Sequence, residues 1–334
     1  MNSYEQRTRN DREGLQWINR FGTLRTAELG RYVWPNDTYA RTRADRIARG
    51  WLQRGLVIAR TLPDGAGRTL VLSEAGARLL RSDGIKANSG KDIGETKAGR
   101  WIAPADWKHD LMTAGVLLSM YERNYEIHTE REIRTANPTL TKFPDGLIRH
   151  PDEPDAVYWL EVENARKSGR PMESLANALC IVSDGQCRAV SGMKPNHCMV
   201  AYVPKATDER HYQLNHRIRV TRAIERTATR NVTVNWAACL MRGAGVLMTE
   251  IEAELIKASP ADRLLKVMLA IDWVETSEGA FASHYGDRRF YIWEDEYGRW
   301  YCQLNDGIPL TAESKADGLR GCALLLSEDL AQHP

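Results

Sequence analysis

Cysteine is scarce in this chain of 334 residues, and none of its six cysteines forms a Cys-x-x-Cys pair. Their spacing fits no common zinc pattern, so a small disulfide-linked scaffold and a cysteine-based zinc site are both excluded. No apolar run approaches the ~20 residues that span a bilayer. The first residues, MNSYEQRTRNDRE, lack the apolar core of a signal peptide. We therefore expect a cytoplasmic protein with reduced, mostly buried thiols.

The motifs of several common enzyme classes are also missing. The eight histidines form no His-Glu-x-x-His pair, which excludes the common zinc peptidases. They form no His-hydrophobic-His pair either, which argues against relaxases with a tyrosine nucleophile. The chain has no Gly-x-x-x-x-Gly-Lys-Ser/Thr loop for a nucleotide. The composition, 43% hydrophobic and 27% charged, is that of globular domains, and the length predicts two or three of them.

Positive charge is concentrated at the front of the chain. Residues 1–100 hold 19 Lys and Arg against 11 Asp and Glu, a net charge of +8, whereas the remainder carries −6. A basic segment joined to an acidic body indicates nucleic acid as the partner of the front segment.

Residues 1–82 are predicted to form helices and a β-hairpin, and their order resembles a winged helix-turn-helix. Apolar residues recur at helical spacing in the helices, and Pro63-Asp64-Gly65 favours a turn within the hairpin. The predicted helices cover residues 12–21, 26–33, 39–54 and 73–80, and the strands cover 56–61 and 68–72.

Arginines gather on the third of these helices and on the hairpin. An apolar stripe of Ala44, Ile47, Ala48, Trp51 and Leu52 occupies the core side of the helix, so its arginines face outward. They predict contacts with DNA phosphates and guanines, and a solvated basic face is the alternative. The candidate DNA-binding residues are Arg41, Arg43, Arg46, Arg49 and Arg68.

The rest of the chain is predicted to contain a linker at 83–104, an α/β domain at 105–245 and an α+β module at 246–334. The linker is rich in Gly, Ser, Lys and Asp. The domain has the predicted order αβββαβαβ. Its helices are expected at 106–123, 171–182 and 211–229, and its strands at 125–133, 142–148, 157–163, 197–203 and 231–240.

The C-terminal module is predicted to begin with a helix-like bridge at 249–269 and to end with a helix at 311–326. Between them lies an aromatic-rich antiparallel sheet. The aromatic residues favour the core of that sheet, and stacking on single-stranded bases is the alternative. They are Trp273, Phe281, Tyr285, Phe290, Tyr291, Trp293, Tyr297, Trp300 and Tyr301.

Three acids lie on two successive predicted strands of the α/β domain. Asp145 begins one strand, and Glu161 and Glu163 share one face of the next. Carboxylates this close repel one another unless a cation lies between them, and Mg²⁺ (or Mn²⁺) prefers such ligands. These residues therefore predict a metal site for phosphodiester hydrolysis. Lys167 is the preferred catalytic cation, and Lys142 is the second.

These motifs resemble two known patterns. Pro144-Asp145-Gly146 followed by Glu161-Val162-Glu163 resembles the PD-(D/E)xK nucleases, with Glu163 where lysine is usual. The stretch LEVENARKS at 160–168 resembles the replication-relaxation family, which includes MobC-type plasmid mobilisation relaxases. Trp107-x-His109-Asp110 and the TEREIR segment at 129–134 also look like that family. The resemblance covers about residues 12–205.

This resemblance implies a winged helix joined to a restriction-endonuclease-like domain that nicks DNA. Asp145, Glu161 and Glu163 would hold Mg²⁺, and Lys167 would replace the missing lysine. His109 and Asp110 are candidates to support or bind the metal, with ordinary residues of a helix surface as the favoured alternative. Glu130 is a similar candidate and is expected on a strand. The implied partners are double-stranded and nicked DNA at an origin of transfer, with other mobilisation or replication proteins. The alternatives are a DNA-binding regulator with a degenerate nuclease domain and an adaptor whose aromatic module binds a partner.

Overall fold

The structure of the chain is a computed structural model of a mixed α/β protein, whose described residues contain three sheets. It describes residues 3–164, 167, 169–204, 216–228, 230–242, 245–257, 268, 272–276, 279–285, 287–305 and 307–332. In these ranges, no helix is both long and apolar enough to cross a membrane. The chain divides into two compact units. The first contains Met1–Lys167, Ile181–Arg219 and Thr233–Glu254, and the second contains Ser168–Cys180, Val220–Val232 and Leu255–Pro334.

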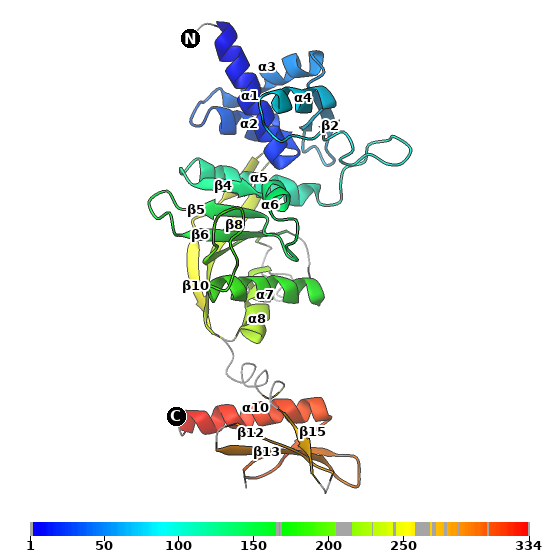
Figure 1. The fold of residues 1–334 in the computed structure, drawn as a ribbon, viewed down its shortest axis with the longest axis vertical. Helices are drawn as coiled ribbons and strands as arrows, with labels where there is room; N and C mark the ends of the chain where they lie inside the picture. The colour runs from blue at the N-terminus through cyan, green and yellow to red at the C-terminus, as the bar shows by residue number, and fades with distance from the viewer. Residues whose placement is uncertain are drawn as a thin grey trace. The chain divides into compact units, whose positions relative to one another are not determined.

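The N-terminal part of the first unit consists of helices around a three-stranded antiparallel sheet (Figure 1). The predicted helices and hairpin are present, and an additional short strand, β1, pairs with β3. The sheet order is β1-β3-β2. The elements are α1 (Ser3–Phe21), β1 (Leu24–Arg25), α2 (Thr26–Val33), α3 (Ala40–Gln53), β2 (Val57–Thr61), β3 (Arg68–Leu72) and α4 (Glu74–Ser82).

Close packing fixes α2 against α3. A Cβ atom on Gly30 would lie 2.5 Å from the carbonyl oxygen of Ala40, so only glycine permits this approach. Trp51 of α3 is fully buried, and its indole nitrogen donates a hydrogen bond to Asp11 of α1 at 2.6 Å. The apolar stripe of α3 thus faces the core as predicted, except that Leu52 is exposed.

The segment predicted as a linker folds back on the three-stranded sheet. The amide of Gly90 donates to the carbonyl of Leu72 at 2.8 Å, and Ala87 is buried. Glu95 and Trp101 form an isolated antiparallel bridge within the same segment. The segment is therefore a packed loop and not the flexible linker that its polar composition predicted.

A seven-stranded mixed sheet forms the second part of this unit. Strands β4, β5 and β6 pair antiparallel, and β6, β7 and β8 pair parallel. The order is β10-β8-β7-β6-β5-β4, and β9 pairs with β8. The strands are β4 (Glu126–Thr129), β5 (Gly146–Arg149), β6 (Val157–Glu163), β7 (His197–Tyr202), β8 (Val232–Arg242), β9 (Gly245–Met248) and β10 (Glu252–Ile256), and the helices are α5 (Trp107–Tyr121) and α6 (Glu130–Ala136). Two further helices, α7 (Arg170–Ser183) and α8 (His216–Thr227), belong for most of their length to the second unit.

Three sequence predictions in this region were wrong. The strand expected at 125–133 ends at Thr129, because Thr129 and Glu132 form a capping box that begins α6. The strand expected from 142 begins only at Gly146. The helix-like bridge expected at 249–269 contains strand β10, because pairing with β8 outweighs local helix propensity. Most of its remaining residues lie outside the described ranges.

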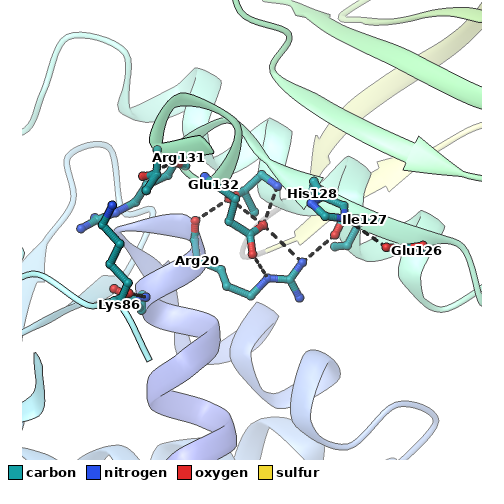
Figure 2. A network of polar contacts seen from close by, with 10 residues as sticks. Arg20, Lys86, Glu126, Ile127, His128, Arg131 and Glu132 are labelled. Atoms are coloured by element: carbon teal, nitrogen blue, oxygen red, sulfur yellow. Dashed lines mark hydrogen bonds and ion pairs between the residues drawn. The ribbon is translucent and has the colours of Figure 1, made fainter. Parts of the chain in front are cut away.

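One hydrophobic core joins the two parts of the first unit. It includes Trp17 and Tyr32 from the N-terminal helices together with Leu117 of α5 and Leu160 of β6. The hydroxyl of Tyr32 donates to the carbonyl of Ala114 at 2.9 Å. Polar contacts reinforce this junction: Figure 2 shows Arg20 bonded to Glu132 (2.7 Å) and to the carbonyl of Ile127 (2.6 Å). The N-terminal helices and the larger sheet are therefore packed as one body.

The C-terminal part of the second unit is an antiparallel sheet packed against a terminal helix, as predicted. Phe290, Ile292 and Cys302 from the sheet are buried with Cys322 and Leu326 from the helix. The helix lies a few residues later in the chain than expected. The elements, in sheet order, are β11 (Val274–Glu275), β12 (Phe281–Tyr285), β13 (Arg288–Glu294), β14 (Trp300–Leu304) and β15 (Leu310–Ala312), followed by α10 (Lys315–Gln332).

Candidate functional site

Asp145 lies at the start of β5, beside β6. Its amide donates to the carbonyl of Leu160 at 2.9 Å, which continues the pairing of the two strands. Its Oδ2 accepts a hydrogen bond from the amide of Val162 at 2.7 Å and lies 3.2 Å from Nε2 of His109. Burial alone would raise the pKa of Asp145. The bond to His109 and the positive charge of that residue outweigh burial and lower the pKa.

Glu161 is fully buried on β6, and its two oxygens have different partners. Oε1 accepts a hydrogen bond from the indole of Trp159 at 2.7 Å, and Oε2 accepts one from Nζ of Lys142 at 2.7 Å. Burial and the negative charge of Asp145 raise the pKa of Glu161 to about 7, against the opposing effect of Lys142. This carboxyl group therefore changes its charge near neutral pH.

Glu163 lies two residues farther along β6 and is also fully buried. Its Oε1 forms an ion pair with Lys167. Its Oε2 is buried and has no hydrogen-bond partner among the described residues. Burial raises the pKa of Glu163, and Lys167 only partly counteracts this effect. The side chain thus has one oxygen available to a further ligand.

His109 and Asp110 lie in the first turn of α5. His109 contacts Asp145 through Nε2, and its Nδ1 lies 3.8 Å from Oδ1 of Asp110. Burial opposes the charge of His109, but its bonds to the two aspartates raise its pKa to about 10. The residue therefore supports Asp145 as an imidazolium cation.

A pocket of about 330 Å³ opens beside Asp145. Its walls come from the end of α1 and the residues that follow it, from α5, and from α6. Glu130 lies there on helix α6, which corrects the prediction that it lies on a strand, and it accepts a hydrogen bond from Nε of Arg134 at 2.7 Å. The lining residues are Phe21, Thr23, Asp110, Thr113, Thr129, Glu130, Arg131, Arg134, Thr135 and Asp145.

The structure thus brings Asp145, Glu161 and Glu163 onto neighbouring strands, each with its own cation. Sequence reasoning ranked Lys142 below Lys167, but each contacts one buried glutamate. Thr113, Arg131 and Arg134 were not predicted as site residues. The pattern Thr129-x-x-Glu132 could have placed the two arginines on a helix, because it is a capping box. Thr113 lies on α5, and no local pattern marks it as a site residue.

Some arginines of α3 bond to other groups of the protein, and others do not. Arg43 forms an ion pair with Asp37 at 3.0 Å, and Nε of Arg49 donates to the carbonyl of Asp45 at 3.3 Å. Arg41 and Arg46 are exposed and form no ion pair with a described residue. Arg68 is exposed at the start of β3. The predicted DNA-binding residues therefore remain accessible, although Arg43 and Arg49 have internal partners.

The described residues contain no group of three His, Cys, Asp or Glu side chains arranged to hold a metal ion. Comparison with known proteins gave no relationship: the sequence matches no protein-family model and no curated protein.

Proposed function

We propose that this protein is a divalent-metal-dependent DNA nicking endonuclease that acts at an origin of plasmid mobilisation or replication. The observation that carries the proposal is the placement of three buried acids, Asp145, Glu161 and Glu163, at the adjoining ends of β5 and β6, with a lysine beside each glutamate. Burying a carboxylate costs free energy unless a cation or hydrogen bonds compensate it, and acids with perturbed pKa values are typical of catalytic sites.

The order of the elements supports the same proposal. A helix, three antiparallel strands, a helix and a parallel strand resemble the core of restriction-endonuclease-like domains, and here α5, β4, β5, β6, α7 and β7 follow that order, with α6 inserted. The N-terminal helices with the β2–β3 hairpin resemble a winged helix, in which α3 would enter the major groove. The outward arginines of α3 suit contacts with phosphates and guanines.

The oxygens of the three acids are of the type that a hard divalent cation prefers, although the acids are not grouped to hold one in this structure and would have to draw together around it. Among the described residues, Oε2 of Glu163 is buried without a hydrogen-bond partner, and Oδ1 of Asp145 accepts no hydrogen bond. Glu161 would contribute after Lys142 releases its Oε2. Asp145, Glu161 and Glu163 would hold the cation, which would polarise a DNA phosphate and lower the pKa of an attacking water.

The proposal also gives a role to the lysines and the histidine beside the three acids. Lys142 and Lys167 neutralise the two buried glutamates when no divalent cation is bound. Released from the glutamates, either ammonium group could bind a phosphate oxygen of the DNA. His109 would keep Asp145 ionised and oriented, because it holds Oδ2 from the side of α5.

Relaxation of supercoiled plasmid carrying the native origin, with Mg²⁺, Mn²⁺ or EDTA, tests this function. We expect nicking with the metals only, and we expect Asp145→Ala and Glu161→Gln to lower its rate by about 100-fold or more, because a metal ligand is lost. Glu153→Gln is the matched control, since Glu153 is an exposed acid between the same two strands. Equal nicking by the wild type and Asp145→Ala would show that the acids are not the active site.

The second candidate is a DNA-binding regulator or replication accessory protein that does not cut. The observation that favours it is the engagement of both oxygens of Glu161 by Trp159 and Lys142, which leaves that carboxylate satisfied without a metal. Calorimetric titration with Mn²⁺ separates the candidates. A nuclease should bind Mn²⁺ and lose this binding in Asp145→Ala, whereas an inactive protein should bind origin DNA but no Mn²⁺.

A further inference from the structure

One arginine of the pocket beside Asp145 forms no ion pair with a described residue, although Asp110, Glu130 and Asp145 also line that pocket. Arg131 lies in the first turn of α6 and lines the pocket, close to the end of α1 (Figure 2). It is partly buried and forms no ion pair with a described residue. Burial lowers the pKa of Arg131. A desolvated guanidinium without a partner favours an anionic ligand.

Both acids next to Arg131 in the sequence are committed to other arginines. Glu130 accepts a hydrogen bond from Nε of Arg134 at 2.7 Å. Glu132 accepts one from Nε of Arg20 at 2.7 Å and another from the amide of Thr129 at 2.8 Å, as Figure 2 shows. The two glutamates that flank Arg131 are thus bonded to Arg20 of α1 and Arg134 of α6, and neither pairs with Arg131.

The backbone near Arg131 is adapted to its side chain. Gly22 follows α1 with a φ of +80°, and a Cβ atom there would lie 2.6 Å from Nη1 of Arg131. A larger residue at position 22 would displace the guanidinium. The position of Arg131 against this turn is thus a consequence of a glycine that also ends α1.

A neutral donor lies in the same pocket. Thr113 of α5 is buried, and its hydroxyl has no hydrogen-bond partner among the described residues. A buried hydroxyl without a partner costs free energy, which a ligand with acceptor oxygens would recover. A guanidinium and a hydroxyl together suit a phosphate group, which offers several acceptor oxygens.

We infer that this pocket binds a backbone phosphate of the DNA strand, with Arg131 and Thr113 as its ligands and Asp145 on the adjoining wall. The inference rests on the proposed function, because Asp145 would then face a neighbouring phosphate. The volume of about 330 Å³ lies within the range of small-ligand pockets, about 300–1,000 Å³. Arg131 acts here as a positioning residue, which fixes the strand relative to the acids.

The test measures binding of a short fluorescent DNA duplex with a single-stranded tail, in EDTA, over a series of salt concentrations. Arg131→Gln should weaken binding about tenfold and reduce the slope of log Kd against log salt by about one, because one phosphate contact is lost. Arg123→Gln is the matched control: Arg123 is exposed just after α5 and does not line the pocket. Equal affinity and equal slope in the two variants would overturn the inference.

Two further arms make the assignment specific. Replacing single DNA phosphates by neutral methylphosphonates should reveal one position at which the replacement weakens wild-type binding but not Arg131→Gln binding. Arg131→Lys should restore part of the salt slope, which loss of folding in the glutamine variant could not explain. Saturation of the pocket by inorganic phosphate alone, with no methylphosphonate position coupled to Arg131, would identify a site for a free anion and refute the DNA assignment.

These measurements separate the phosphate site from the proposed nuclease. Because they use EDTA and record no cleavage, a coupled methylphosphonate position supports the pocket even if no plasmid is nicked. Conversely, metal-dependent nicking combined with an unchanged salt slope in Arg131→Gln would support the nuclease and reject the pocket as a phosphate site.

Discussion

At the scale of single residues, the pKa of each buried carboxylate reflects a balance between burial and the cation beside it. Glu161 and Glu163 have raised pKa values because burial penalises their charge more than Lys142 and Lys167 favour it. Asp145 has a lowered pKa because His109 contacts it directly. Residues of one chemical type thus differ in charge state, and only their surroundings explain the difference.

The contact between His109 and Asp145 predicts a pH dependence of stability. Folding raises the pKa of His109 from 6.5 to about 10, so its stabilising effect is complete below pH 6.5 and is lost as the pH rises to about 10. Each pKa unit corresponds to about 1.4 kcal/mol. We expect the free energy of unfolding of the wild type to fall over this range relative to that of His109→Gln, as measured by urea denaturation.

His284→Gln provides the control for this measurement, since His284 is exposed on β12. Its stability should follow the wild type at every pH. If His109→Gln also followed the wild type across the whole range, the two aspartates would not stabilise the protonated form of His109.

At the scale of elements, local sequence signals begin the helices and close contacts set their spacing. Ser73 begins α4 by accepting a hydrogen bond from the amide of Gly76, and Thr129 and Glu132 begin α6 through a capping box. Gly30 allows α2 to approach α3. The capping signals are visible in the sequence, whereas the role of Gly30 depends on what lies across from it.

Two helical glycines should respond to alanine in opposite directions. Gly30→Ala should destabilise the protein by about 1–3 kcal/mol, because its Cβ would collide with the backbone of Ala40. Gly50→Ala, in α3, should stabilise it by up to about 1 kcal/mol, because nothing lies within 4 Å of the added methyl group and alanine favours the helix. Thermal denaturation measures both, and similar effects of the two variants would contradict this helix spacing.

At the scale of the whole molecule, the basic residues and the buried acids lie in different parts of the chain. Residues 1–100 carry a net charge of +8, and the buried acids lie at the adjoining ends of β5 and β6. A shared core and the contacts of Arg20 join the N-terminal helices to the larger sheet. A DNA-binding surface on α3 would therefore be held in a fixed relation to the acids.

The exposed arginines of α3 should dominate the salt dependence of DNA binding. Arg46→Ala should weaken binding and reduce the slope of log Kd against log salt by about one. The DNA phosphate that Arg46 no longer contacts would keep its bound counterion, so one fewer ion is released on binding. Arg43→Ala should have a smaller effect, since Asp37 already neutralises Arg43. Arg299→Ala, whose arginine pairs with Asp295 in the second unit, is the control. An unchanged slope in Arg46→Ala would remove this helix from the interface.

The sequence by itself determined most elements and two separate groups of site candidates. Helical periodicity identified α3 and α5, a proline near its start indicated α7, and the run from Val157 to Glu163 matches β6 in full. The acids were found because carboxylates alternate with apolar residues there, a pattern that depends only on the two-residue period of a strand. The charge asymmetry likewise needs no coordinates.

Only the tertiary structure decided which groups meet. Lys142 contacts Glu161 from 19 residues away, and His109 contacts Asp145 from 36 residues away, so no local pattern predicts either pair. Strand β10 exists because β8 offers an edge to pair with. Arg131 does not pair with its neighbouring glutamates, because they bind Arg134 and Arg20. Periodicity and capping act within a few residues, whereas ion pairs and strand edges join segments that only folding brings together.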